Sequence, residues 1–155
     1  MTDTHWLTPE QQRMWRLLLD AHAVIFRRID EQLHTDSELG SSEYSVLVRL
    51  SEAPETTLRL NQIGTYLGWD RSRCSHLIRR MEKRGLVDKK TCAEDGRGIL
   101  VSLTDLGAER LSAAAPGHAD LVKSMIFSDL SSDDIETLST FYRRIIERRD
   151  LGNRP

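Results

Sequence analysis

One stretch of the sequence is crowded with side chains that can bind phosphate groups and read the edges of nucleic-acid bases. An arginine can donate two parallel hydrogen bonds to guanine, while serine hydroxyls and a histidine ring can bond to either bases or phosphates. The side chains of this kind are Arg71, Ser72, Arg73, Ser75, His76 and Arg79. They indicate binding to DNA, and Arg73 is the best candidate for the paired contact with guanine.

The charge distribution favours the same chemistry. The 155-residue chain has a formal net charge of −2. Between Asp70 and Arg97, however, nine basic residues against five acidic ones give +4, and the other 13 basic and 19 acidic residues give −6. A basic segment in an acidic chain points to a localised face for a polyanion, although a solvated charged helix would give the same counts.

The basic segment also carries an apolar stripe, which predicts the element that positions it. Four apolar residues follow the spacing i, i+3, i+4 and i+7 and so share one face of a helix. They are Cys74, Leu77, Ile78 and Met81. A shorter helix is expected before it, with Asn61 as its N-cap and Gly68 at its end. Two short helices joined by a tight turn, the second apolar inside and basic outside, form a helix-turn-helix.

Two strands are predicted next, at 87–91 and 99–103, with Asp95-Gly96 as the turn between them. A hairpin directly after a recognition helix is a wing. Lys89 and Lys90 lie on its first strand and join the candidate DNA contacts. Arg97 lies at its tip, where a guanidinium suits a minor groove. A structural role for Arg97, pairing with an acid or a helix end to shape the wing, stays open.

Long amphipathic helices flank this module. Thr8-Pro9-Glu10-Gln11 predicts a capped helix start, and apolar residues then recur every three to four positions over roughly 25 residues. A helix is expected after Thr104, with a kink or break at Pro116-Gly117 before His118. Ser131-Ser132-Asp133-Asp134 predicts the start of the last helix.

The expected fold class is therefore mainly α (α+β): a winged helix-turn-helix with N- and C-terminal helices that form a dimerisation region. The winged module is assigned to residues 41–103, the helical dimerisation region to 8–35 plus 104–150, and tails to 1–7 and 151–155. The terminal helices are too apolar to remain bare, and packing against a second copy would cover them in a homodimer.

The composition excludes several other classes of protein. Apolar residues make up 39% of the chain and glycines number 9, which is ordinary for a globular protein. The apolar runs are too short to span a bilayer, and the start lacks the regions of a secretion signal. We expect a cytoplasmic chain without membrane contact. No catalytic motif, cofactor fingerprint or metal-ligand spacing is found, so neither an enzyme nor a cofactor is expected.

The cysteines and aromatic residues leave alternatives open. Cys74 is interpreted as a small buried residue of the apolar stripe. Cys92, beside two lysines, is a candidate redox sensor, although an exposed thiol without function is the more common case. Trp15, Trp6 and Tyr44 are candidates to line a pocket for a small aromatic effector, or else they pack in the core or an interface.

Two segments resemble the multiple antibiotic resistance regulator (MarR) family of bacterial transcription factors. Asp95-Gly96-Arg97, followed by an alternating strand and Leu103-Thr104-Asp105-Leu106-Gly107, is similar to the family's wing signature. Residues 71–87 resemble its recognition helix and the exit from it, and residues 8–15 resemble the first helix of actinobacterial members. The resemblance covers about residues 8–146. One departure is Gly64, where the family has a small alanine and a looser helix is expected here.

The resemblance implies a homodimer on a pseudo-palindromic operator in double-stranded DNA, usually repressing a gene until a small molecule or an oxidant releases it. It also implies that the six side chains of the basic helix face the major groove and that Arg97 enters the minor groove. The predicted function is thus a sequence-specific regulator, expected to be a repressor. The alternative is a winged module for protein–protein assembly, whose basic face meets an acidic partner.

Overall fold

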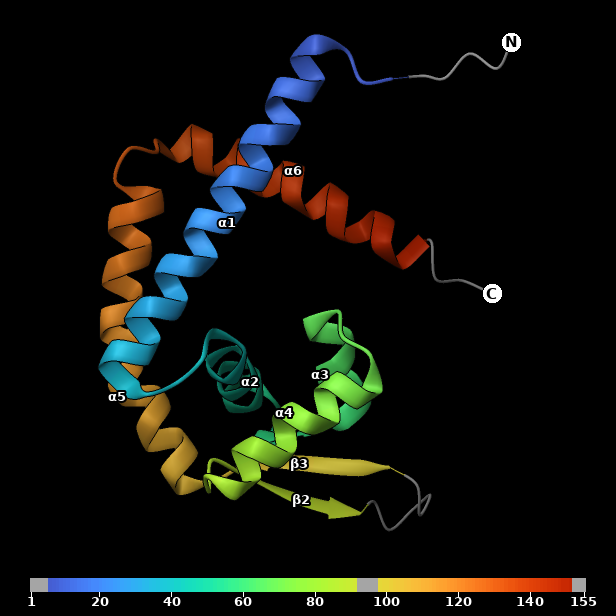
Figure 1. Ribbon diagram of the computed structural model, residues 1–155, viewed down its shortest axis with the longest axis vertical. Coiled ribbons are helices and arrows are strands. Elements are labelled where there is room, and N and C mark those ends of the chain that lie inside the picture. The colour runs from blue at the N-terminus through green and yellow to red at the C-terminus, as the bar shows by residue number, and fades with distance from the viewer. Residues whose placement is uncertain (1–5, 92–97, 152–155) are drawn as a thin grey trace. The chain divides into compact units, whose positions relative to one another are not determined.

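The computed structural model describes residues 6–91 and 98–151, with side chains described as far as residue 148 (Figure 1). The chain forms two compact units, residues 1–119 and residues 120–155. The predicted wing turn and the candidates Cys92 and Arg97 lie outside the described residues.

The elements confirm a mainly α fold with a small antiparallel sheet. In chain order they are α1 (Pro9–Ser37), α2 (Ser41–Glu52), η1 (Pro54–Thr56), β1 (Thr57–Arg59), α3 (Leu60–Leu67), α4 (Arg71–Lys83), β2 (Val87–Thr91), β3 (Ile99–Leu103), α5 (Asp105–Val122), η2 (Lys123–Phe127) and α6 (Ser132–Leu151). The sheet has the strand order β1-β3-β2, with β3 in the centre. Both strands of the wing have the predicted bounds, and Lys89 lies opposite Val101.

The core of residues 1–119 is built around the apolar stripe of α4. All four stripe residues, Cys74, Leu77, Ile78 and Met81, are at most 1% exposed. They belong to one cluster with buried residues of α2 and of the strands, among them Val46, Leu47, Leu50, Val87 and Val101. Helices α3 and α4 lie side by side (Figure 1). Burial of the stripe therefore turns the opposite, basic face of α4 outward.

The long first helix begins as its sequence predicts. The Thr8 hydroxyl accepts a hydrogen bond from the Gln11 amide, and the Gln11 side chain accepts one from the Thr8 amide. This reciprocal capping box satisfies two amides that the helix itself leaves unpaired. The helix continues to Ser37, and Glu38, in the left-handed region at φ 55°, closes it.

Two predicted boundaries are wrong. Helix α3 begins at Leu60 instead of after an Asn61 cap, because β1 passes directly into it and Gln62 accepts a hydrogen bond from the Arg59 amide. The break that was one of the two outcomes expected at Pro116 is absent, since α5 runs unbroken from Asp105 to Val122; the kink stays a prediction. A proline removes a single helical hydrogen bond, and a wider π-type turn, η2, follows the helix.

The second unit, residues 120–155, has no buried residue among its described side chains. Its last helix starts as predicted, because the Ser131 hydroxyl accepts a hydrogen bond from the Asp134 amide and donates one to the Asp134 carboxylate. The hydrogen bonds that the Asp134 carboxylate accepts from the Ser131 hydroxyl and the Ser131 amide lower the pKa of Asp134, so the carboxylate stays charged at the helix start, where negative charge is favourable.

Close contacts around Thr104 hold the start of α5 against the residues that follow α4. The Thr104 hydroxyl donates to the Gly85 carbonyl at 2.7 Å and accepts from the Gly107 amide at 3.0 Å. A Cβ atom at Gly107 would clash with the Leu86 carbonyl oxygen and would lie 2.8 Å from the Leu103 side chain. The threonine and the glycine of the Leu-Thr-x-x-Gly signature are therefore both required by this close approach of α5 to the exit of α4.

Gly107→Ala should destabilise the fold by about 3 kcal/mol, because the new methyl group meets backbone that cannot move aside. Gly40→Ala is the matched control. Its backbone is extended, the nearest atom to a new Cβ is 3.9 Å away, and we expect a loss of less than about 1 kcal/mol. Urea unfolding of both variants measures the difference, and equal losses would contradict the close approach.

Candidate nucleic-acid interface

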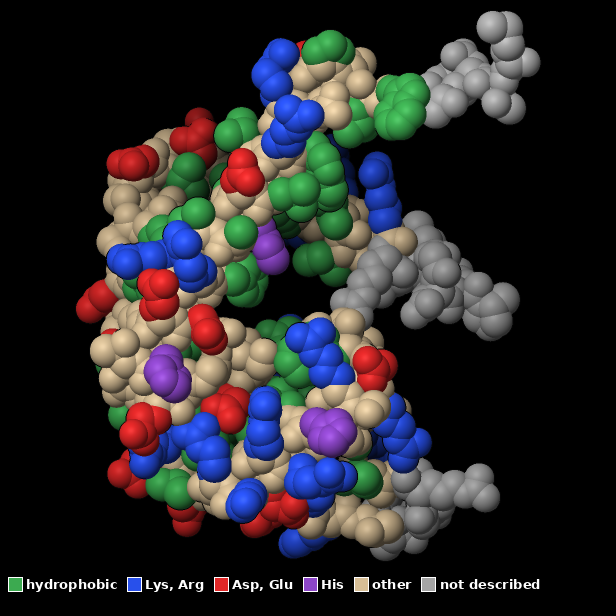
Figure 2. Space-filling model, in the orientation of Figure 1, with side chains coloured by type: hydrophobic (Ala, Val, Ile, Leu, Met, Phe, Trp, Pro, Cys, Tyr) green, Lys and Arg blue, Asp and Glu red, His purple; other side chains and the backbone are tan. Residues whose placement is uncertain are grey.

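The predicted contact residues of α4 lie on its outer face. Arg71, Ser72, Arg73, His76 and Arg79 are exposed, and Ser75 is half-buried. Figure 2 shows basic side chains gathered over the lower part of the view, where the winged module lies. The helix places these six candidates together on one element, next to the apolar stripe that holds it.

The start of α4 is fixed by an aspartate. The Asp70 carboxylate accepts a hydrogen bond from the Arg73 amide at 2.9 Å. This bond, more than any other cause, lowers the pKa of Asp70. The N-cap is therefore a charged carboxylate. It pairs with an otherwise unpaired amide and interacts favourably with the positive end of the helix dipole.

The side chain of Arg73 also has a partner that the sequence analysis missed. Its guanidinium carbon lies 3.7 Å from the centroid of the Trp69 ring. A similar pair joins Arg49 of α2 to Tyr66 of α3, at 4.0 Å. The signal for the first pair was available in the sequence, because Trp69 and Arg73 stand four positions apart across the helix start.

The two wing lysines differ in their surroundings. The Lys89 ammonium lies 2.9 Å from the Glu82 carboxylate, so that β2 is tied to α4. Lys90 is exposed. The structure thus ties Lys89 to the recognition helix, whereas no ion pair of this kind is found for Lys90 among the described residues.

The C-terminal end of α4 is held by Arg84, whose partners lie far away in the sequence. The Arg84 guanidinium contacts the Glu43 carboxylate at 2.7 Å and donates to the Glu38 carbonyl, also at 2.7 Å. Glu43 is only 8% exposed, and it accepts a further hydrogen bond from the Gly40 amide. These contacts join the end of α4 to the end of α1 and the start of α2. Glu38, Glu43 and Arg84 line a pocket together with His34. No local sequence pattern could have predicted these contacts.

Cys74 is confirmed as a buried residue of the stripe. Its thiol is fully buried and donates a weak hydrogen bond to the Leu60 carbonyl, at 3.7 Å. Burial raises the pKa of this thiol, which keeps it protonated and unreactive.

The candidate effector residues lie in different environments. Trp15 is 50% exposed on α1, whereas Tyr44 is 9% exposed and packs against the His118 ring, with 4.6 Å between ring centroids. His118 is a half-buried residue of α5. Its Nδ1 atom is buried without a hydrogen-bond partner among the described atoms, as is Oε1 of Gln32. Burial also lowers the pKa of His118 and raises that of Tyr44.

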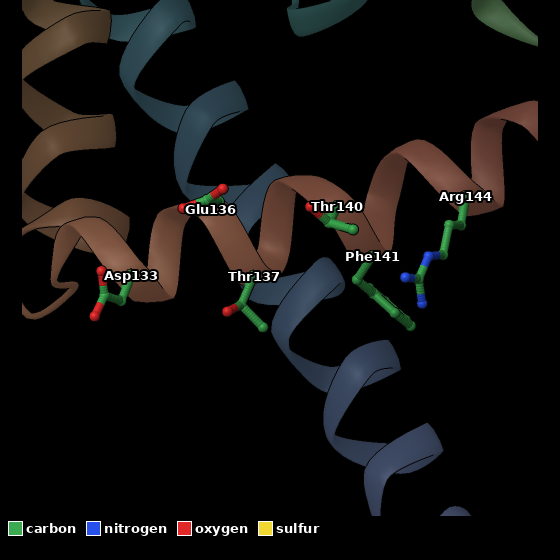
Figure 3. Close-up of a pocket in the computed structure, with 6 residues that line it drawn as sticks. All are labelled: Asp133, Glu136, Thr137, Thr140, Phe141 and Arg144. Atoms are coloured by element: carbon green, nitrogen blue, oxygen red, sulfur yellow. The ribbon is translucent and has the colours of Figure 1, made fainter.

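A second pocket lies on α6 and contains neither candidate. Figure 3 shows its six lining side chains, all of which project from that one helix: Asp133, Glu136, Thr137, Thr140, Phe141 and Arg144. Such a groove on a single helix surface has no opposing wall within the described residues. Among all the residues that the structure describes, no three acidic, histidine or cysteine side chains come together to hold a metal ion. No described helix is both long and apolar enough to cross a membrane.

A short helix, a tight turn, an amphipathic helix with a basic outer face and an antiparallel hairpin together define a winged helix-turn-helix protein. A model of the MarR family matches residues 37–98. Sco3205, a MarR family transcriptional regulator from Streptomyces coelicolor solved in complex with DNA, is 36% identical. That match covers 97% of this chain and 92% of the other, with a TM-score of 0.89. The chain belongs to the MarR family.

Two further relatives agree with this assignment. AbsC, a MarR family transcriptional regulator from Streptomyces coelicolor, is 31% identical over 95% of this chain and 99% of its own, with a TM-score of 0.88. The organic hydroperoxide resistance transcriptional regulator of Bacillus subtilis is 36% identical over 66 residues, or 43% of this chain. That match spans 44% of the relative, less than half its length.

The lowered pKa of the half-buried His118 predicts a dependence of stability on pH. As the pH falls below the ordinary histidine pKa of 6.5, the unfolded chain takes up the proton before the folded chain does. The free energy of unfolding should therefore decrease until the pH has passed the lower pKa of folded His118.

Urea unfolding at about pH 7.5 and about pH 5.5 tests this expectation. His118→Gln should lose less stability over that interval than the unaltered chain does. His76→Gln removes an exposed histidine and is the control, for which the full loss is expected. An unchanged slope in His118→Gln would contradict the assignment.

Proposed function

We propose that this chain is a transcriptional regulator that binds a specific operator in double-stranded DNA as a homodimer, with α4 in the major groove. The observation that carries the proposal is the division of α4 into a fully buried apolar face and an exposed basic face. Such a helix is rigidly held and still free to contact a partner. The relatives' description as transcriptional regulators, one of them in complex with DNA, supports the same function.

The exposed face supplies both kinds of contact that a DNA reader needs. Arg73 can donate a bidentate pair to guanine, and Ser72, Ser75 and His76 can bond base edges or phosphates. Arg71 and Arg79 carry the charge for phosphate contacts, which give affinity without sequence information. From the sequence, Lys89, Lys90 and Arg97 are assigned to the wing's contacts, with Arg97 in the minor groove.

The homodimer is supported by apolar side chains that each unit leaves exposed. On α1 they are Met14, Trp15, Leu17, Leu19, Val24 and Phe26; on α6 they are Ile135, Leu138, Phe141, Tyr142, Ile145 and Ile146. A second copy that covers these faces would bury them by a self-complementary contact. It would also set two copies of α4 about 34–36 Å apart, the spacing of one DNA turn. We accordingly assign 8–35 plus 104–150 to dimerisation and 41–103 to DNA binding.

Release by a small aromatic effector is supported by the surroundings of Tyr44. The buried, unpaired Gln32 Oε1 and His118 Nδ1 atoms are polar groups that a ligand could satisfy, and the Tyr44 ring offers an aromatic contact. A ligand that favours a conformation unable to bind the operator would turn this site into the switch of a repressor. Release by an oxidant at Cys92 stays a prediction from the sequence.

DNA selection from a randomised pool tests the proposed function. The chain should enrich one pseudo-palindrome and bind it about a thousandfold more tightly than a scrambled duplex. Arg73→Ala should lose about 1–3 kcal/mol of discrimination at one base pair, whereas Arg79→Ala should weaken binding to all sequences alike. Equal, weak binding to selected and scrambled DNA would instead favour the assembly module with an acidic protein partner.

A charge placed on the apolar face of α6 tests the dimer. Ile145→Glu should shift the chain from dimer to monomer in sedimentation equilibrium and weaken operator binding, because a carboxylate cannot be buried there unpaired. Thr137→Glu adds the same charge to the polar side of the same helix and should leave the dimer intact. A dimer that survives Ile145→Glu would place the contact elsewhere.

A further inference from the structure

We propose that Trp69 is a positioning residue for base reading: its indole ring holds the Arg73 guanidinium ready for guanine and so sharpens the discrimination between base pairs. The inference rests on the proposed function, because it concerns how α4 reads DNA. It assigns a role to a side chain outside the recognition helix, in the turn between α3 and α4.

The Trp69 indole is held in place by the turn that carries it and by the core. Gly68 closes α3 in the left-handed conformation at φ 67°, and the Trp69 amide donates to the Gly64 carbonyl at 3.0 Å. The Trp69 side chain is half-buried and packs against the core cluster. A Cβ atom at Gly64 would lie 3.3 Å from the Trp69 carbonyl oxygen, so the glycine lets this turn lie close to α3. The ring is therefore a fixed surface at the start of α4.

Arg73 is held at its backbone amide and at the end of its side chain. Its backbone amide is bonded to the Asp70 carboxylate in the first turn of α4, and its guanidinium lies 3.7 Å from the indole centroid. An arginine without such a partner must lose several rotatable bonds of freedom when it binds a base. Holding one rotamer-rich side chain in advance is worth about fivefold in binding.

The contact with the indole also leaves the N–H donors of the Arg73 guanidinium available to a base. A guanidinium that meets an aromatic ring with its face keeps its N–H groups at the edges, and these are the donors for guanine. Side-chain packing alone would need only an apolar residue at position 69. The chain also offers a matched comparison in the Arg49–Tyr66 pair, which has the same chemistry but no member on α4.

The test measures binding to a duplex selected by the unaltered chain, in which each G·C pair is replaced in turn. Trp69→Leu should reduce discrimination about fivefold at the base pair that Arg73→Ala affects, and Trp69→Phe should give a smaller reduction. Trp69→Leu combined with Arg73→Ala should discriminate no worse than Arg73→Ala alone. Tyr66→Leu should leave the profile unchanged.

Three outcomes would overturn the inference. Equal losses at every base pair, or losses that add in the double variant, would mean that Trp69 only stabilises the fold. Sharper discrimination in Trp69→Leu would mean that the ring holds Arg73 away from DNA. Thermal unfolding of each variant, and the milder Trp69→Phe, separate these effects from loss of folding.

A measurement without DNA separates this inference from the proposed function. In the free protein, NMR should find the Arg73 side-chain δ protons shifted upfield by the indole ring, and Trp69→Leu should abolish that shift. Absence of the shift in the unaltered chain would overturn the positioning role even if the operator is bound. Failure to select any sequence, with the shift present, would overturn the proposed function and the reading role that rests on it.

Discussion

Burial of one face of α4 is the contact on which the rest of the structure depends. Cys74, Leu77, Ile78 and Met81 fill the centre of the core, and truncating a residue of this kind costs about 2–5 kcal/mol. Because the stripe occupies one side of a short helix, the arginines on the other side cannot turn inward without emptying the core. The rotation of the recognition helix about its axis, and hence the set of side chains it offers to DNA, follows from this packing.

Polar contacts then fix the helix at its ends. Asp70 caps the start of α4, Glu82 ties its last turns to the wing through Lys89, and Arg84 joins the end of the helix to α1 and α2. The Thr104–Gly107 junction holds the start of α5 against the same exit. A structural change in α1 or α5 can therefore reach the recognition helix through a small number of contacts, as the proposed release by an effector would require.

Much of this architecture could be predicted from local patterns. The bounds of β2 and β3, the capping box at Thr8 and the stripe of α4 depend on residues close in sequence, and the structure agrees with each prediction. The expected break at Pro116 failed because a single missing hydrogen bond does not interrupt a helix that is otherwise continuous.

The contacts that position the site were harder to foresee. Arg84 and Glu43 are 41 residues apart, and no spacing rule connects them. The unpaired state of His118 depends on three-dimensional burial, which a list of histidines in the sequence cannot reveal. The proposed DNA contacts of α4 could be named from the sequence because they are neighbours on one helix, whereas Arg84 is held by residues of α2 and of the end of α1.

A crystal structure of the chain bound to its selected duplex would test the central claim most directly. The account predicts α4 in the major groove, with Arg73 donating to O6 and N7 of one guanine at about 2.7–3.2 Å. Two copies should be related by a two-fold axis through the operator. A complex in which the exposed face of α4 points to solvent or to another protein would contradict it.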